Sequence, residues 1–126
     1  MKRELSDAEW VLMKKLWEKA PMTITQFTAA LQDETGWSKH TIISLLSRME
    51  AKGAVAHRDG ARAKEYYPLL PRDDALRRET KHFLDRVYDG HVGMLMSAIV
   101  DSRTLSPEDL AELSAILERA KEEEGR

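Results

Sequence analysis

The stretch that decides the fold is Ser38–Pro68, SKHTIISLLSRMEAKGAVAHRDGARAKEYYP. Ser38 is a preferred N-cap residue, and the apolar spacing that follows it predicts an amphipathic helix over Lys39–Lys52. The inward face of this helix carries Ile42, Leu45, Leu46 and Met49. Gly53 follows at the position where a left-handed residue commonly ends a helix. The first half of the stretch is therefore one helix with an apolar face and a polar face.

A β-hairpin is predicted directly after this helix. Beyond Gly53 the period of the pattern changes from about 3.6 to about 2, because Val55 and His57 alternate with smaller or polar residues. Asp59-Gly60 supplies a turn, and Glu65–Leu69 resumes extended character. Three basic residues surround the tip of the hairpin: Arg58, Arg62 and Lys64.

Two helices are predicted before the central stretch. Ser6-Asp7-Ala8-Glu9 has the pattern of a capping box, so a first helix should begin there and run to about Lys19, before Pro21. Thr25 is predicted to cap a short second helix that ends near Gly36. The inward residues expected on this second helix are Phe27, Ala30 and Leu31.

Three more helices are predicted after the hairpin, opened at Pro71-Arg72-Asp73-Asp74, after Gly90 and at Ser106-Pro107. We expect residues 1–71 and 72–126 to form two parts. The second part has about 55 residues, close to the lower limit for an independent core, so its apolar faces should meet a second copy of the chain. The residues predicted to make this dimer contact are Leu76, Phe83, Leu84, Val87, Val92, Leu95, Ile99, Leu110, Leu113 and Leu117.

The element order predicts the fold class and, with it, a function. Helix, short strand, helix, helix and hairpin is the order of a winged helix-turn-helix, so the fold should be mainly α (α+β), with a C-terminal helical dimerisation region. In such a domain the third helix enters the major groove of double-stranded DNA. The predicted DNA-binding residues are Ser38, Lys39, His40, Thr41, Ser44, Arg48, Arg58, Arg62 and Lys64. A two-fold dimer would require a palindromic operator.

Charge supports this interpretation modestly. The whole chain has a formal net charge of -2, but residues 38–70 contain six Lys and Arg against three Asp and Glu, a local charge of +3. A basic patch on a mildly acidic protein is compatible with a polyanionic partner, although many such patches never contact nucleic acid.

Composition removes several other classes of protein. The chain has no cysteine, which excludes disulfides, thiolate metal sites and thiol nucleophiles. No apolar run approaches the ~20 residues needed to cross a bilayer, so no membrane partner is predicted. Together with the lack of cysteine, this favours a cytoplasmic protein. We predict no cofactor and no metal. Catalysis is not predicted either, because the Ser, His, Asp and Glu residues fall at caps, turns and exposed helix faces.

Two non-enzymatic alternatives remain open at this point. A winged helix that binds protein partners would expose apolar residues on the third helix, whereas the outward positions predicted here are polar and basic. A small-ligand-sensing regulator would need inward polar residues around an effector pocket, and no such cluster stands out in the sequence.

Several motifs resemble those of one family. They are Leu5-Ser6-Asp7-Ala8-Glu9-Trp10, Leu16-Trp17, Gly36-Trp37-Ser38-Lys39-His40-Thr41, Tyr67-Pro68-Leu69 and Phe83-Leu84-Asp85-Arg86. The chain resembles the penicillinase repressor family, the BlaI/MecI/CopY transcriptional regulators, over nearly its whole length. The resemblance implies a homodimeric repressor whose winged helices bind a palindromic operator, with Lys39, Thr41 and Arg48 at recognition-helix positions.

The chain also departs from that family in two places. Copper-responsive members carry a cysteine-rich C-terminal tail, which is missing here. In antibiotic-responsive members, release from DNA is associated with proteolysis at an Asn-Phe bond, and the matching place here is Ala98-Ile99. This departure argues against the same proteolytic switch in this chain, and an upstream sensor or protease is a partner implied only by the resemblance.

Overall fold

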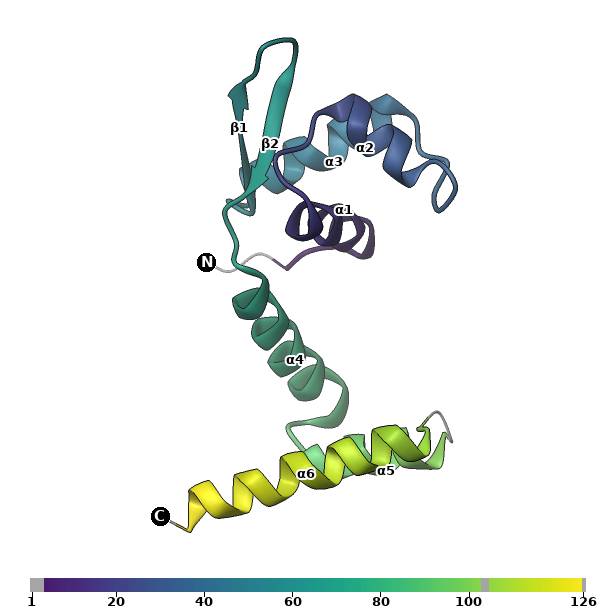
Figure 1. Ribbon diagram of the computed structural model, residues 1–126, viewed down its shortest axis with the longest axis vertical. Coiled ribbons are helices and arrows are strands. Elements are labelled where there is room, and N and C mark those ends of the chain that lie inside the picture. The colour runs from purple at the N-terminus through teal and green to yellow at the C-terminus, as the bar shows by residue number, and fades with distance from the viewer. Residues whose placement is uncertain (1–3, 103–104, 126) are drawn as a thin grey trace. The chain divides into compact units, whose positions relative to one another are not determined.

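The structure, a computed structural model, describes residues 4–102 and 105–125 (Figure 1). The chain divides into two compact units, one up to Glu79 and one from Thr80 onward. The boundary lies inside α4 (Arg72–Tyr88). We call them the N-terminal unit and the C-terminal unit.

The first helix, α1 (Asp7–Glu18), begins as predicted. Ser6 Oγ accepts a hydrogen bond from the Glu9 amide at 3.2 Å, and Glu9 Oε1 accepts one from the Ser6 amide at 2.8 Å. These two bonds satisfy amides that the first turn leaves without intrahelical partners. Lys19 is the C-cap of the helix, directly before Ala20 and Pro21.

The second helix, α2 (Ile24–Leu31), corrects three predictions. Its N-cap is Thr23 instead of Thr25, because Thr23 forms a capping box with Gln26. The helix ends at Leu31, before a turn that leads to Gly36 at φ 64°. Phe27 and Leu31 are buried as expected, but Ala30 is exposed.

The central stretch folds as predicted into α3 (Lys39–Ala51), β1 (Val55–Asp59) and β2 (Lys64–Pro68). Lys52 is the C-cap of α3, and Gly53 follows with φ 78°, a conformation that favours glycine. The strands pair antiparallel, with His57 opposite Tyr66.

One core closes the N-terminal unit. The buried apolar side chains come from α1, α2, α3, the hairpin and Met22, whose backbone bridges Tyr66 of β2. The core residues are Leu12, Met13, Leu16, Met22, Phe27, Leu31, Ile42, Leu45, Leu46, Met49, Ala54, Val55 and Tyr66. Trp17 and Trp37 pack at its edge, and the Trp17 indole donates a hydrogen bond to the Leu70 carbonyl at 2.9 Å. This core holds α3 with its polar side outward.

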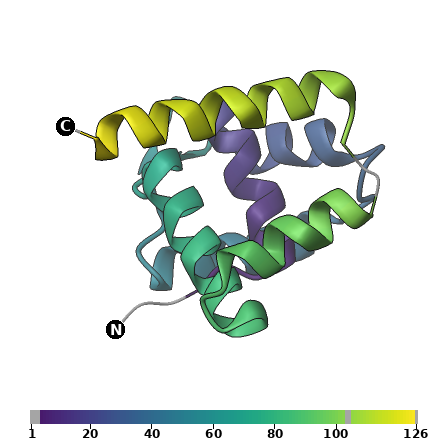
Figure 2. The ribbon, with the colours of Figure 1, turned by 90° about the horizontal axis from the view of Figure 1, so that it is seen from below.

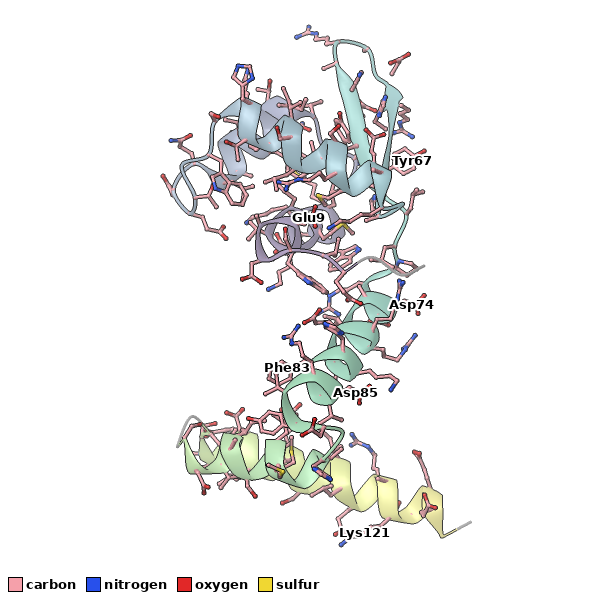
Figure 3. All side chains as sticks on the ribbon, turned by 180° about the vertical axis from the view of Figure 1, so that it is seen from behind. Glu9, Tyr67, Asp74, Phe83, Asp85 and Lys121 are labelled. Atoms are coloured by element: carbon pink, nitrogen blue, oxygen red, sulfur yellow. The ribbon has the colours of Figure 1, made fainter. Side chains whose placement is uncertain are left out.

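The C-terminal unit contains the end of α4, α5 (Val92–Asp101) and α6 (Pro107–Glu124). Helix α6 begins at the predicted site, where Ser106 and Asp109 form a capping box. The helices α5 and α6 overlap in Figure 1 but lie apart in Figure 2. Phe83 of α4, which is labelled in Figure 3, packs against Tyr88 with ring centroids 5.9 Å apart.

None of the described residues from Thr80 onward is buried. On α6, Leu110, Ile116 and Leu117 are exposed within the single chain. Leu113 is half-buried. Three helices with so little shared interior cannot enclose their apolar faces by themselves.

Candidate nucleic-acid interface

The outward side of α3 is a largely polar helix face. Because Ile42, Leu45, Leu46 and Met49 enter the core, the remaining side of the helix must face solvent. All six predicted DNA-binding residues of this segment are exposed: Ser38, Lys39, His40, Thr41, Ser44 and Arg48. The structure thus leaves this polar face accessible to a partner.

The first turn of α3 is held by its own cap. Ser38 Oγ accepts a hydrogen bond from the Thr41 amide at 3.3 Å and lies 3.3 Å from the Thr41 hydroxyl. The amides at the very start of the helix point away from its body, where free N–H groups and the helix dipole both favour an anion.

An open groove runs beside α3, between the beginning of α1 and Trp37. It is lined by Ala8, Trp37, His40, Thr41, Ser44, Leu45 and Arg48. Four of the predicted residues therefore share one groove. Among the described residues, neither Lys39 nor Arg48 has an ion-pair partner, so both charges are available to a ligand.

One outward residue of α3 was not anticipated. Ile43 is 44% exposed, although we expected the outward positions to be only polar and basic. That expectation is wrong at Ile43. The spacing correctly placed Ile42 on the inward face, but it left the neighbouring Ile43 unassigned.

The hairpin is anchored beside the end of α3. His57 Nδ1 of β1 lies 2.6 Å from Glu50 Oε2 of α3, and the His57 ring packs on Tyr66 at 5.3 Å between centroids. Burial raises the pKa of Tyr66, and the charge of Glu50 raises it further. These contacts fix the hairpin to the helix that carries the polar face.

The three basic residues of the hairpin differ in their surroundings. Arg58 Nε donates to Glu65 Oε1 across the two strands at 3.1 Å. Arg62 and Lys64 are exposed and have no ion-pair partner in the described part of the chain. Arg62 and Lys64 are therefore more available to an anionic partner than Arg58, whose charge is paired with Glu65.

The turn between the strands requires glycine. A Cβ atom at Gly60 would lie 2.6 Å from the Ala63 carbonyl oxygen and 2.8 Å from the Glu65 side chain. Gly60 also donates its amide to the same carbonyl at 2.9 Å. A larger residue at this position would displace the turn or the side chain of Glu65, which pairs with Arg58.

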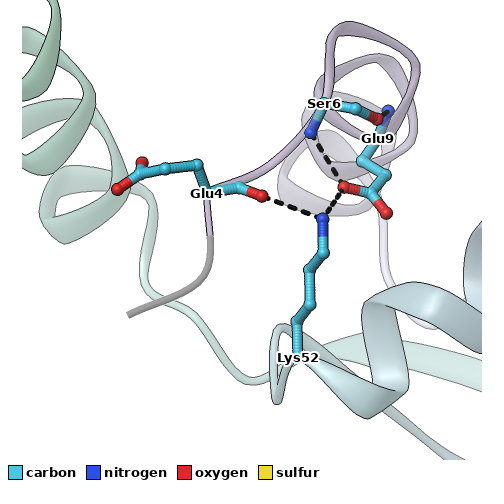
Figure 4. Close-up of polar contacts among 4 residues, drawn as sticks. All are labelled: Glu4, Ser6, Glu9 and Lys52. Carbon is cyan, nitrogen blue, oxygen red and sulfur yellow. Dashed lines mark hydrogen bonds and ion pairs between the residues drawn. The ribbon is translucent and has the colours of Figure 1, made fainter. Parts of the chain in front are cut away.

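A buried ion pair ties the far end of α3 to the start of α1 (Figure 4). Lys52 Nζ donates to Glu9 Oε1 at 2.5 Å and to the Glu4 carbonyl at 2.8 Å. Glu9 is only 1% exposed. Burial alone would raise the pKa of Glu9, but the hydrogen bonds from Lys52 and Ser6 and the charge of Lys52 outweigh it, so that pKa is lowered.

Sequence reasoning identified Glu9 as a capping residue and missed its second role. Lys52 and Glu9 are 43 positions apart, and no local pattern connects them. The pair orients α3 against α1, and it therefore belongs to the framework of the polar face instead of to the face itself.

Other kinds of site are not found among the described residues. They contain no group of three or more His, Asp or Glu side chains arranged to hold a metal ion. No helix in that part of the chain combines the length and apolar character needed to cross a membrane.

Three helices followed by a two-stranded hairpin, with an outward polar helix, define the N-terminal unit as a winged-helix domain of the DNA-binding class. A sequence profile of the penicillinase repressor family matches residues 5–119, and the chain belongs to that family. Family membership confirms the resemblance seen in the motifs, and the family is one of transcriptional repressors.

Relatives agree with this assignment. The methicillin resistance regulatory protein MecI of Staphylococcus aureus is 29% identical over 116 residues, which are 92% of this chain and 94% of MecI. The penicillinase repressor of Bacillus licheniformis is 30% identical over 118 residues, 94% of this chain and 92% of that protein.

Solved structures support the fold. The solution structure of the DNA-binding domain of the repressor BlaI has a TM-score of 0.51 and 32% identity, covering 59% of this chain and 93% of that domain. The monomeric form of Bacillus licheniformis BlaI, solved in complex with the blaP half-operator, gives the same values of 0.51, 32%, 59% and 93%.

Proposed function

We propose that this protein represses transcription by binding a palindromic operator as a homodimer, with α3 in the major groove and the hairpin against the flanking backbone. The observation that carries this proposal is the outward face of α3, where Lys39 and Arg48 are exposed beside His40, Thr41 and Ser44. Neither Lys39 nor Arg48 has an ion-pair partner among the described residues. Such side chains donate hydrogen bonds to base edges and phosphates.

Two kinds of contact are assigned to the DNA-binding residues. The side chains of Lys39, His40, Thr41, Ser44 and Arg48 contact the major groove and its margins. Arg62 and Lys64 of the hairpin, joined by Arg58, neutralise phosphates outside it. The amides of Ser38 and Lys39 add a place for one phosphate at the helix start.

The dimer is proposed from the C-terminal unit. It exposes apolar side chains along α5 and α6, including Val92, Met94, Val100, Leu110 and Leu117. A homodimer would bury them, and its two-fold axis would place two copies of α3 on two half-sites about one or more DNA turns apart. Residues from 72 onward would then form the dimerisation region, as the sequence predicts.

The experiment begins by selecting bound duplexes from random DNA with the full-length protein. Lys39→Ala and Arg48→Ala should each weaken binding to the selected sequence by about 1–3 kcal/mol, measured by mobility shift. Lys14→Ala is the matched control, because Lys14 is an exposed lysine on α1. Unchanged affinity in both α3 variants, or selection of no common sequence, would contradict the proposal.

A further inference from the structure

Ile43 is an exposed apolar side chain within an otherwise polar surface. It is 44% exposed, and the neighbouring outward residues of α3 are Lys39, His40, Ser44 and Ser47, all exposed. The side chains three and four positions away are the helical neighbours of a residue, and for Ile43 these are Lys39, His40, Ser47 and the buried Leu46. The exposed neighbours of Ile43 on the face proposed to enter DNA are therefore all hydrogen-bonding residues.

The fold does not explain why this residue is isoleucine. The four apolar residues that α3 contributes to the core are Ile42, Leu45, Leu46 and Met49, and each is buried. A β-branched residue at an exposed helical position has a lower helix propensity than alanine or a long polar residue. Ile43 thus lies outside the buried core, and the exposed part of its side chain is available to a ligand that binds this face of α3.

The size of the exposed group decides which ligand. Docking of a protein onto an apolar surface uses a contiguous patch of a few hundred Å². Ile43 is a single side chain among polar ones, so a protein partner fits it poorly. In the major groove, by contrast, the 5-methyl group of thymine is an isolated apolar feature among hydrogen-bonding groups.

We infer that Ile43 contacts the 5-methyl group of one thymine in each half-site and is a specificity-determining residue. This inference rests on the proposed function, since it requires α3 to lie in the major groove. The β-branched side chain suits the contact, because its χ1 angle has one strongly preferred rotamer in a helix and little entropy is lost on binding. The polar neighbours of Ile43 would meanwhile contact donors and acceptors on adjacent bases.

The test removes one methyl group at a time from the DNA. In the duplex selected from random DNA, each thymine of one half-site is replaced in turn by deoxyuridine, which keeps every hydrogen-bonding group and lacks only the methyl. We expect one replacement to weaken binding of the unaltered protein about four-fold, the value for one buried methyl group. Ile43→Ala should lose most of this discrimination at the same thymine and at no other.

Two controls accompany this double-mutant comparison. Leu69→Ala truncates a similarly exposed apolar side chain, 52% accessible, that lies outside α3, and it should keep the full deoxyuridine effect. Thermal unfolding should show that Ile43→Ala is folded, because alanine is a better helix former and no core contact is lost.

The outcomes separate this inference from the proposed function. Specific binding in which every deoxyuridine affects the unaltered protein and Ile43→Ala equally would overturn the inference while leaving the repressor proposal intact. Failure to select any sequence, or indifference to Lys39→Ala and Arg48→Ala, would overturn both.

Discussion

The two units of this chain solve the problem of burying apolar surface differently. The N-terminal unit encloses Leu12, Phe27, Ile42, Leu46 and Met49 completely, whereas no described residue from Thr80 onward is buried. Both contain well-capped amphipathic helices, so local helix formation does not distinguish them. The difference is that the N-terminal helices converge on one core, and the C-terminal helices leave exposed faces that a second subunit would cover.

The chain offers a matched pair for testing this contrast, because its two phenylalanines lie in different units. Phe27 is fully buried and Phe83 is half-buried. Phe27→Ala should lower the free energy of unfolding by about 3–5 kcal/mol, since it leaves a cavity in a closed core. Denaturant unfolding at several protein concentrations measures this loss, which should not depend on concentration.

Phe83→Ala should behave differently under the same protocol. Its loss should shrink at high protein concentration, because mass action restores a weakened dimer. If both variants lost the same unfolding free energy at every protein concentration, the proposed difference between the two units would be wrong.

The second largest effect is expected at the exposed face of α6. Leu117 is 61% exposed in the single chain. Leu117→Glu should weaken self-association by on the order of 100-fold, because it would bury a carboxylate without a partner. Sedimentation of the full-length protein measures this shift, and Leu69→Glu, in the N-terminal unit, serves as the control. A monomeric unaltered protein at micromolar concentration would contradict the dimer.

A smaller effect tests how the N-terminal unit holds α3. Glu9→Gln should cost about 1–3 kcal/mol of stability at neutral pH, because Lys52 loses its charged partner. The pKa of Glu9 is lowered from an ordinary 4.5, so the stabilisation exists above that value and is lost as the pH falls through the lowered pKa.

The unaltered protein should therefore lose stability more steeply than Glu9→Gln from about pH 5 downward. Chemical unfolding at a series of pH values compares the two slopes. Parallel slopes would show that the ion pair does not stabilise the fold, whereas Lys14→Ala should reproduce the unaltered profile.

The smallest effect is expected at the hairpin. It tests whether only the N-terminal unit contacts DNA. Arg62→Ala should reduce the slope of log affinity against log salt concentration by about 1, because one phosphate contact is lost. Arg58→Ala should change it less, since Glu65 already pairs with Arg58. Arg119→Ala on α6 is the control in the C-terminal unit. An unaltered slope in Arg62→Ala would remove the hairpin from the interface.

Local chemistry was sufficient to predict most elements. The capping boxes at Ser6 and Ser106, the left-handed Gly53 and the hairpin turn at Gly60 depend on residues within a few positions of one another. The second helix was predicted with the wrong cap, although its capping box is local as well. Thr23 and Thr25 are both acceptable caps, and the reciprocal bond from Gln26 decides in favour of Thr23.

The candidate interface was likewise only partly predictable from the sequence. Sequence periodicity identified the polar face of α3, because its spacing places Lys39, Ser44 and Arg48 opposite the core. It placed Ile42 in the core, but it listed only polar and basic residues on the outward side and so omitted the exposed Ile43. It also did not reveal the neutralisation of Arg58 by Glu65, which depends on the strand register.

What the sequence determined by itself is the order of the elements, their caps and the family, because these depend on neighbouring residues and on motifs. Only the tertiary structure decided that Glu9 pairs with Lys52, that His57 pairs with Glu50 of α3, and that Ile43 faces solvent. Such contacts depend on how separate helices and strands meet in space. One-dimensional spacing carries no information about that geometry.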